Sequence, residues 1–184
     1  MNQVRIFALG GLDEDGKNLT VVDINQDLFV IDVGLKYPDK DRLGVEIIIP
    51  DFKYLIENKQ RIIGIFITHG HDDAMAALPY LIKQVNLPIY TTPLTAKLIE
   101  KLFKEEKLSD YQIKVIKRDD NLNIGKVNIR TFSLTHSIAD AFGIAIESPF
   151  GYIVYAGEYI IDFNTRNPAF ACDITNFAEI GKKG

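Results

Sequence analysis

Several residue types are scarce in this chain, and the scarcity of cysteine and of long apolar runs excludes two classes of protein. The 184 residues include no tryptophan, one cysteine and three histidines. The single cysteine, Cys172, has no partner for an internal disulfide, which agrees with a reducing compartment. No apolar run approaches the ~18 residues of a membrane span, and the amino terminus lacks the regions of a signal peptide. We therefore expect a cytoplasmic protein with no membrane partner.

Composition and charge are those of an ordinary globular protein. With 47% hydrophobic and 25% charged residues, the chain has enough apolar material for one domain, or one domain and a piece of another. The net charge of -4 means that a nucleic-acid binder would need a local basic surface. The lysines between positions 97 and 107 alternate with glutamates, which favours a solvated helix face over a stripe that contacts nucleic acid.

Apolar alternation broken by turn residues predicts a mixed α/β layered fold. Strands are expected over residues 4–9, 19–24, 28–33, 62–67, 87–90, 112–116, 127–134, 142–147 and 152–156. Helices are expected after an Asp51 cap, over residues 74–85 with an interruption at Pro79, and from Pro93 through Lys107 behind a Thr92 cap. Leu94, Leu98 and Leu102 share one face of the last helix. Strand-rich ends around a strand-helix middle are typical of layered α/β proteins.

All three histidines directly follow predicted strands. His69 and His71 come after the apolar run 62–68, and His136 follows the strand that ends at Leu134. Because side chains alternate in extended backbone, His69 and His71 project to the same side. With His136 they would form a three-nitrogen site with a fourth position open to water, as in catalytic zinc sites. The glycine-rich stretch 10–18 would let backbone approach a site closely, but it lacks the spacing of a phosphate-binding loop.

The motif His69-Gly70-His71-Asp72-Asp73-Ala74 resembles the HxHxDH signature of the metallo-β-lactamase superfamily, with its last histidine replaced. Further stretches resemble one branch, the ribonuclease J family of β-CASP nucleases. They are Gly10-Gly11, Gly16-Lys17-Asn18, Asp32-Val33-Gly34-Leu35, Tyr37-Pro38, Ile48-Ile49-Pro50-Asp51, Leu78-Pro79-Tyr80-Leu81 and His136-Ser137-Ile138. The resemblance covers essentially the whole chain.

This resemblance implies an αββα sandwich that hydrolyses RNA with water activated by two metal ions. It implies that His69, His71 and His136 hold the first metal, expected to be one zinc per chain. Asp73 would bind the second metal and is the tentative catalytic residue. Glu158, which follows the last predicted strand, stands where the family has a bridging aspartate. Asp32 matches an aspartate that braces the site without binding metal.

The departures from the motif weaken the second metal position. Ala74 offers no ligand, Glu158 is one methylene longer than aspartate, and the remaining family histidine lies far downstream, beyond a β-CASP domain. The oxygen pair of Asp73 and Glu158 would hold zinc weakly and suits manganese or magnesium. Asp72 and Asp73 also have a simpler interpretation, because carboxylates are favoured at helix starts. Ala74 could be an engineered change, but two departures in one site favour a natural paralogue.

Two functional hypotheses remain. In one, the protein is a ribonuclease J-like metal-dependent RNA hydrolase whose second site is degenerate. In the other, it is a non-catalytic or weakly catalytic subunit that binds RNA or an active ribonuclease J paralogue. We expect residues 1–184 to be the first segment of the sandwich, with the β-CASP domain and the remaining sandwich elements outside this chain. An incomplete sandwich would expose apolar surface, which favours a homo- or hetero-oligomer.

Overall fold

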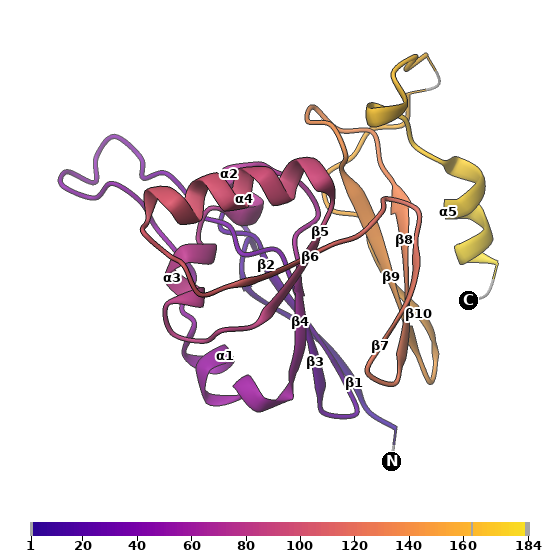
Figure 1. Cartoon of the computed structure of the whole chain (residues 1–184), viewed down its shortest axis with the longest axis horizontal. Helices are drawn as coiled ribbons and strands as arrows, with labels where there is room; N and C mark the ends of the chain where they lie inside the picture. The colour runs from indigo at the N-terminus through magenta and orange to yellow at the C-terminus, as the bar shows by residue number, and fades with distance from the viewer. Residues whose placement is uncertain (1, 163, 183–184) are drawn as a thin grey trace.

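The computed structural model describes residues 2–162 and 164–182. Two β-sheets lie face to face between helices (Figure 1). The first sheet has the order β1-β2-β3-β4-β5-β6, and the second has the order β10-β9-β8-β7. The strands of the first sheet are Val4–Gly10, Leu19–Ile24, Asp27–Ile31, Ile62–Phe66, Pro88–Thr91 and Gln112–Val115. Those of the second are Asn121–Ile124, Val127–Ser133, Phe142–Ser148 and Gly151–Tyr155.

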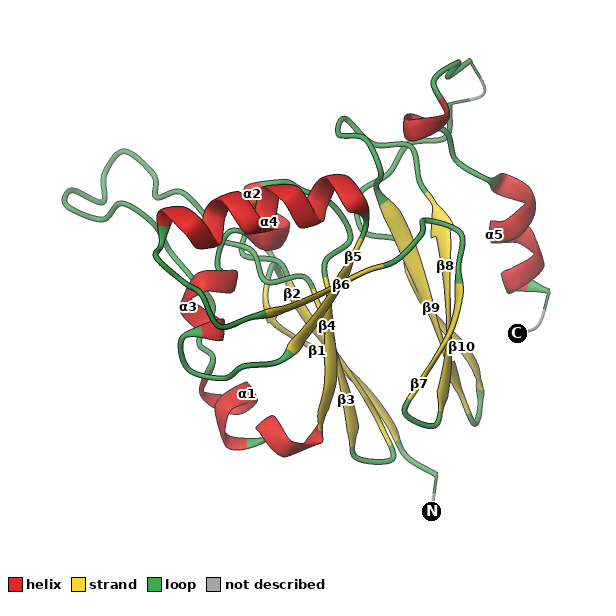
Figure 2. Cartoon of the chain, in the orientation of Figure 1, coloured by secondary structure: helices red, strands yellow, loops and turns green. Residues whose placement is uncertain are grey.

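The helices lie on the two outer faces of this pair of sheets (Figure 2). Helices α1 (Lys53–Glu57), α2 (Asp72–Met75), α3 (Leu78–Ile82) and α4 (Pro93–Glu105) cover the first sheet, and α5 (Ile174–Gly181) lies against the second. The expected αββα layering is thereby confirmed. Among the described residues, no helix is long and apolar enough to cross a membrane.

Three hydrophobic clusters hold the layers together. One lies between the first sheet and its helices and includes Leu28, Ile65 and Phe103. A second joins the two sheets through Phe29, Phe66 and other side chains. A third lies beneath α5. Because both faces of the central strands are covered, β3 and β4 consist almost entirely of buried apolar residues, as parallel strands usually do.

In the first sheet, strand pairing changes from antiparallel to parallel at β3, next to the site. Strands β1, β2 and β3 pair antiparallel, whereas β3, β4, β5 and β6 pair parallel. Parallel strands end at the same edge of a sheet, so the residues after β3 and β4 lie side by side. The hydrogen bond from the Asp32 backbone N–H to the Phe66 carbonyl, 2.9 Å long, joins these two ends.

The structure refines several expected elements. The helix expected over 74–85 is two short helices, because Pro79 lies in the first turn of α3, where its missing N–H costs little. Thr92 precedes α4 as expected, but its hydroxyl donates to the Asp140 carbonyl, 3.0 Å away, instead of capping the helix. The buried face of α4 is formed by Ala96, Ile99 and Phe103, with Leu94 exposed. Strand β7 and helix α5 were not expected.

Candidate metal centre

Three backbone segments are hydrogen-bonded to one another beneath the site. The Asn18 N–H donates to the Asp73 carbonyl, the Val33 N–H to the Ala74 carbonyl and the Gly34 N–H to the Asn18 carbonyl, at 2.7–3.0 Å. Gly34 is required here, because a Cβ at this position would lie 1.4 Å from the Asp73 carbonyl oxygen. The glycine-rich loop before β2, the turn after β3 and the start of α2 therefore form one hydrogen-bonded base.

The three histidines meet above this base. His69 and His71 follow β4, and His136 arrives from the end of β8 in the other sheet. One nitrogen from each ring lies within 4.8 Å of the others, and His136 Nε2 is 3.1 Å from His71 Nδ1. Ligand nitrogens in tetrahedral zinc sites lie about 2.0–2.1 Å from the ion, which places them roughly 3.3 Å apart. The histidine cluster, His69, His71 and His136, therefore has the dimensions of a metal site.

The state of His69 also fits a metal ligand. Burial and the neighbouring His136 and His71 lower the pKa of His69 to about 3, so the ring is neutral near neutral pH. Its Nε2 atom is one of two buried side-chain polar atoms without a hydrogen-bond partner in the described part of the chain. A buried lone pair without a partner is costly unless something binds it. Neutral imidazole with a free nitrogen is the form that coordinates a metal.

Asp32 supports His69 through Thr68. The Thr68 backbone N–H and hydroxyl both donate to Asp32 Oδ1 at 2.9 Å, and the same hydroxyl lies 2.9 Å from His69 Nδ1. Asp32 is buried at the end of β3, with a positive φ of 60°, a conformation that Asp tolerates better than most residues. Burial raises the pKa of Asp32 to about 7, while the hydrogen bonds from Thr68 and Tyr155 oppose this rise.

The carboxylates near the cluster differ in how firmly they are held. Asp73 Oδ2 accepts a 2.9 Å hydrogen bond from the Asn18 side chain, and Asp73 Oδ1 lies 3.9 Å from His69 Nε2. Asp72 points the other way and accepts a 2.7 Å hydrogen bond from the Tyr37 hydroxyl. Glu158 is exposed on the loop after β10, outside the histidine cluster. Burial and the neighbouring His71 lower the pKa of His136, and the charge of Glu158 only partly opposes this shift.

Ala74 is fully buried in α2. Its carbonyl accepts from the Val33 N–H and its own N–H donates to the His71 carbonyl. The position is therefore a packed part of the base that carries no side chain able to bind metal. The structure brings His69, His71, His136 and Asp73 together, places Asp32 behind them, and leaves Ala74 and Glu158 without a demonstrable ligand role.

Four residues that contact this site were not selected from the sequence: Asn18, Tyr37, Thr68 and Tyr155. Asn18 and Tyr37 lie in stretches that carry the family resemblance, and this resemblance was the signal that could have identified them. Thr68 directly precedes His69 in the chain. Tyr155 could not be found by position, because its hydroxyl meets Asp32 across 123 residues of sequence.

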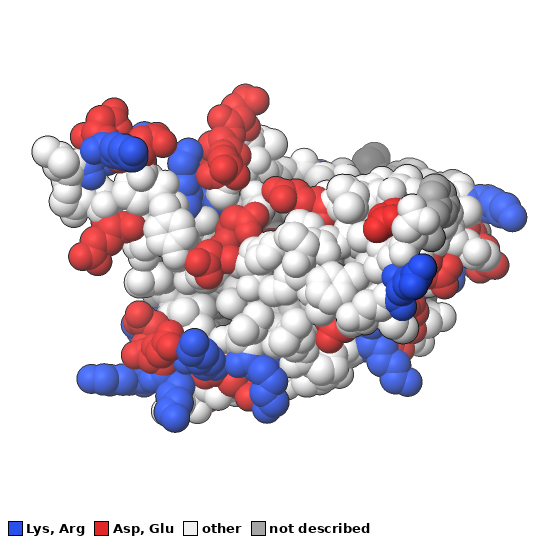
Figure 3. All heavy atoms as spheres, turned by 90° about the horizontal axis from the view of Figure 1, so that it is seen from above, with Lys and Arg blue, Asp and Glu red and all other residues white. Residues whose placement is uncertain are grey.

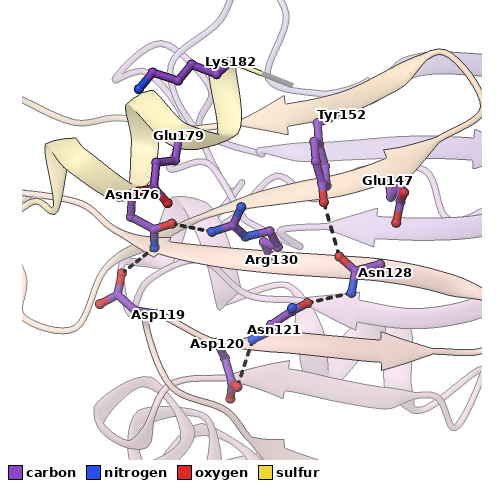
Figure 4. Close-up of a pocket in the computed structure, with 10 residues that line it drawn as sticks. All are labelled: Asp119, Asp120, Asn121, Asn128, Arg130, Glu147, Tyr152, Asn176, Glu179 and Lys182. Atoms are coloured by element: carbon purple, nitrogen blue, oxygen red, sulfur yellow. Dashed lines mark hydrogen bonds between the residues drawn. The ribbon is translucent and has the colours of Figure 1, made fainter. Parts of the chain in front are cut away.

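A polar hollow on the outer face of the second sheet is a different kind of feature (Figure 4). The Arg130 guanidinium donates to the Asn176 side chain at 2.9 Å, and Asn128 donates to Asn121 at 2.6 Å. The Tyr152 hydroxyl lies 3.4 Å from Asn128 Oδ1. These hydrogen bonds pair the polar side chains of the hollow with one another, and the bond between Arg130 and Asn176 joins α5 to the second sheet. They therefore account for the position of α5.

The surface beside the histidine cluster carries more acidic than basic side chains. Seen from above, the molecule has acidic side chains spread over its middle and most lysines and arginines toward its edge (Figure 3). A surface pocket beside Asp72 and Asp73 is lined by two further aspartates, Asp15 and Asp39, and one cation, Lys36. On α4, Lys97 lies 2.7 Å from Glu100, and both side chains are exposed, as expected for a solvated face. Neither region provides the local basic surface that RNA phosphates require.

The sequence of this chain is similar to a known protein family and to several curated proteins. Residues 47–165 match the family described as Beta-lactamase superfamily domain. The chain is 38% identical over 182 residues to ribonuclease J 2 from Staphylococcus epidermidis, which covers 98% of this chain and 32% of that protein. The chain thus spans about a third of the length of the curated relatives that it matches.

Solved structures show the same fold at low sequence identity. The short form of human tRNase Z aligns with a TM-score of 0.55 and 15% identity, over 86% of this chain and 69% of that one. The metallo-beta-lactamase fold protein YhfI from Bacillus subtilis aligns with a TM-score of 0.57 and 12% identity, over 84% and 62% of the two chains.

Proposed function

Because this chain belongs to the beta-lactamase superfamily, we propose that it forms the first-metal half of a ribonuclease J-type RNA hydrolase. The observation that carries the proposal is the histidine cluster, with one ring nitrogen each from His69, His71 and His136 within 4.8 Å of the others. These residues would hold one zinc ion. Bound zinc lowers the pKa of water and stabilises charge that develops on a phosphate.

The side chains around the cluster have separate tasks in this proposal. Asp32, through Thr68, keeps the His69 Nδ1 atom engaged, which leaves Nε2 free for the metal. Asn18 holds one oxygen of Asp73, so that its other oxygen faces the cluster. Asp73 could then accept a proton from water or bind a second cation. We expect that second position to be weak and to favour manganese or magnesium over zinc, because Asp73 and Glu158 offer only oxygen.

The residues at the expected second metal position favour a second candidate function. Ala74 is buried and contributes no ligand, Glu158 is exposed outside the cluster, and the pocket beside Asp73 is lined mainly by aspartates. These features fit a non-catalytic or weakly catalytic subunit that keeps the fold and pairs with an active ribonuclease J paralogue. In that case the basic surface for RNA would come from the partner or from parts of the protein outside this chain.

A nuclease assay with matched variants tests the proposal. A single-stranded RNA with a fluorophore at its 5′ end would be incubated with the protein plus zinc, manganese or both. The hydrolase proposal predicts slow cleavage that disappears in His136→Gln and persists in Lys101→Gln, an exposed control on α4. Zinc binding without any cleavage would favour the non-catalytic subunit. Cleavage that survives His136→Gln would exclude the cluster as the centre of the activity.

A further inference from the structure

Tyr155 joins the second sheet to the support of the histidine cluster. It is the last residue of β10, and its ring packs in the hydrophobic cluster between the sheets. Its hydroxyl lies 3.1 Å from Asp32 Oδ2, on the opposite sheet. The neighbouring tyrosine on the same strand, Tyr152, packs in a different cluster beneath α5. Among the described residues, Tyr155 makes the one hydrogen bond that reaches Asp32 from the second sheet.

The hydrogen bonds behind His69 form a chain with one consistent direction. A carboxylate only accepts hydrogen bonds, and a hydroxyl has a single proton to donate. Asp32 receives the Thr68 N–H and is within 3.1 Å of the hydroxyls of Thr68 and Tyr155. Since the Thr68 hydroxyl gives its proton to Asp32, it accepts from His69 Nδ1. That places the ring proton of His69 on Nδ1 and leaves Nε2 as the lone pair that has no other partner.

We propose that Tyr155 is a positioning residue for the metal site. By donating to Asp32 Oδ2 it holds the carboxylate in the orientation in which it accepts from the Thr68 hydroxyl, and thereby favours the His69 tautomer whose Nε2 faces the cluster. It also ties the sheet that supplies His136 to the sheet that supplies His69 and His71. The inference rests on the proposed function only in assuming that the cluster binds metal. Partners behind metal-ligating histidines commonly change metal affinity by about 10–100-fold when they are removed.

The test compares Tyr155→Phe with Tyr152→Phe, which removes a hydroxyl from the same strand that lies 3.4 Å from Asn128 and not near Asp32. Imidazole nitrogen-15 spectra of the metal-free protein at pH 8.5 report the tautomer of each histidine. With three histidines in the chain, His71→Gln and His136→Gln assign the signals. Zinc affinity is measured by competition with a chromophoric chelator. Neither readout involves RNA, so a chain that fails to cleave RNA would leave this test unaffected.

We expect the unaltered protein to hold His69 as the Nδ1–H tautomer. Tyr155→Phe should give a mixture of tautomers at His69 and about tenfold weaker zinc binding, whereas Tyr152→Phe should change neither. An Nε2–H tautomer in the unaltered protein would overturn the inference whatever the variants do. So would an unchanged tautomer and affinity in Tyr155→Phe, or equal changes in both variants, since a general loosening of β10 would affect both alike.

Discussion

The two halves of the candidate site differ in how many side chains able to bind metal they bring together. The histidine half, His69, His71 and His136, has converging rings, and His69 is neutral near neutral pH and supported through Thr68. The oxygen half, Asp73, Ala74 and Glu158, has one tethered carboxylate, one buried methyl group and one exposed carboxylate. The difference lies in the side chains that the two halves offer. It teaches that a fold can bring three metal-binding rings together while the positions beside them carry few groups able to bind metal.

The largest effect should come from the histidine half. Replacing His69 with glutamine removes a ligand that the packing cannot replace, so zinc affinity should fall more than 100-fold, beyond the about 10–100-fold typical of outer partners. Isothermal titration with zinc measures this loss, and Lys101→Gln on α4 is the control. A loss below tenfold would remove the contrast between the two halves, because the cluster would then not be the main binding site.

Restoring a ligand at Ala74 should have the next largest effect. A histidine at this fully buried position is larger than the space allows, so Ala74→His should lower the free energy of unfolding by about 1–3 kcal/mol without metal. Excess zinc should recover part of this loss, because a ligand that binds only the folded state stabilises it. Urea unfolding with and without zinc measures both terms, and Ala76→His in the same segment is the matched control.

If Ala74→His were destabilised equally with and without zinc, the missing side chain would not be what weakens the oxygen half. The exposed position of Glu158 would then be the better explanation. The double variant with Glu158→Asp distinguishes these cases.

A smaller, acid-dependent effect should come from a region remote from either half. Burial alone would raise the pKa of Asp23, but hydrogen bonds from Arg5 and Arg61 outweigh it and lower that pKa. A depressed carboxyl pKa contributes stability above its unfolded value near pH 4, and this contribution is lost as pH falls through the folded pKa. Asp23→Asn should therefore cost about 1 kcal/mol at pH 7 and much less at pH 2. A cost independent of pH in urea unfolding would contradict this ion-pair account.

The smallest effect on zinc binding should come from Asp73. Its side chain reaches solvent and lies 3.9 Å from His69 Nε2, so its charge should contribute no more than about 1 kcal/mol, or about fivefold in zinc affinity. Asp73→Asn keeps the shape and most of the contact with Asn18. A loss as large as that of His69→Gln would show that the oxygen half binds the tight metal, which would break the comparison.

Local alternation and polar residues at strand ends predicted most strands, a mixed α/β layered fold and the positions of the three histidines, whereas the αββα order was implied by the family resemblance. Strand β7 was not predicted, because its two asparagines alternate with only two apolar residues. Helix α5 begins with an Asp173 cap that accepts from the Asn176 N–H, a pattern that was available but not used. The cytoplasmic location and the β-CASP domain outside this chain remain predictions.

The supports of the site could not be predicted in the same way. Asn18 meets Asp73 across 55 residues, and Tyr155 meets Asp32 across 123. Such contacts depend on how the sheets pack, and residue periodicity does not encode that packing. For Ala74, the sequence showed only that the last histidine of the motif is replaced. The structure added that this alanine is a buried part of the base beneath the cluster.

The most direct test of the account is the number of tightly held zinc ions per chain. The protein would be incubated with excess zinc, passed over a chelating resin and weighed intact by native mass spectrometry, with His69→Gln alongside. We expect one zinc per chain in the unaltered protein and none in the variant. Two tightly held zinc ions, or one that persists in His69→Gln, would contradict it.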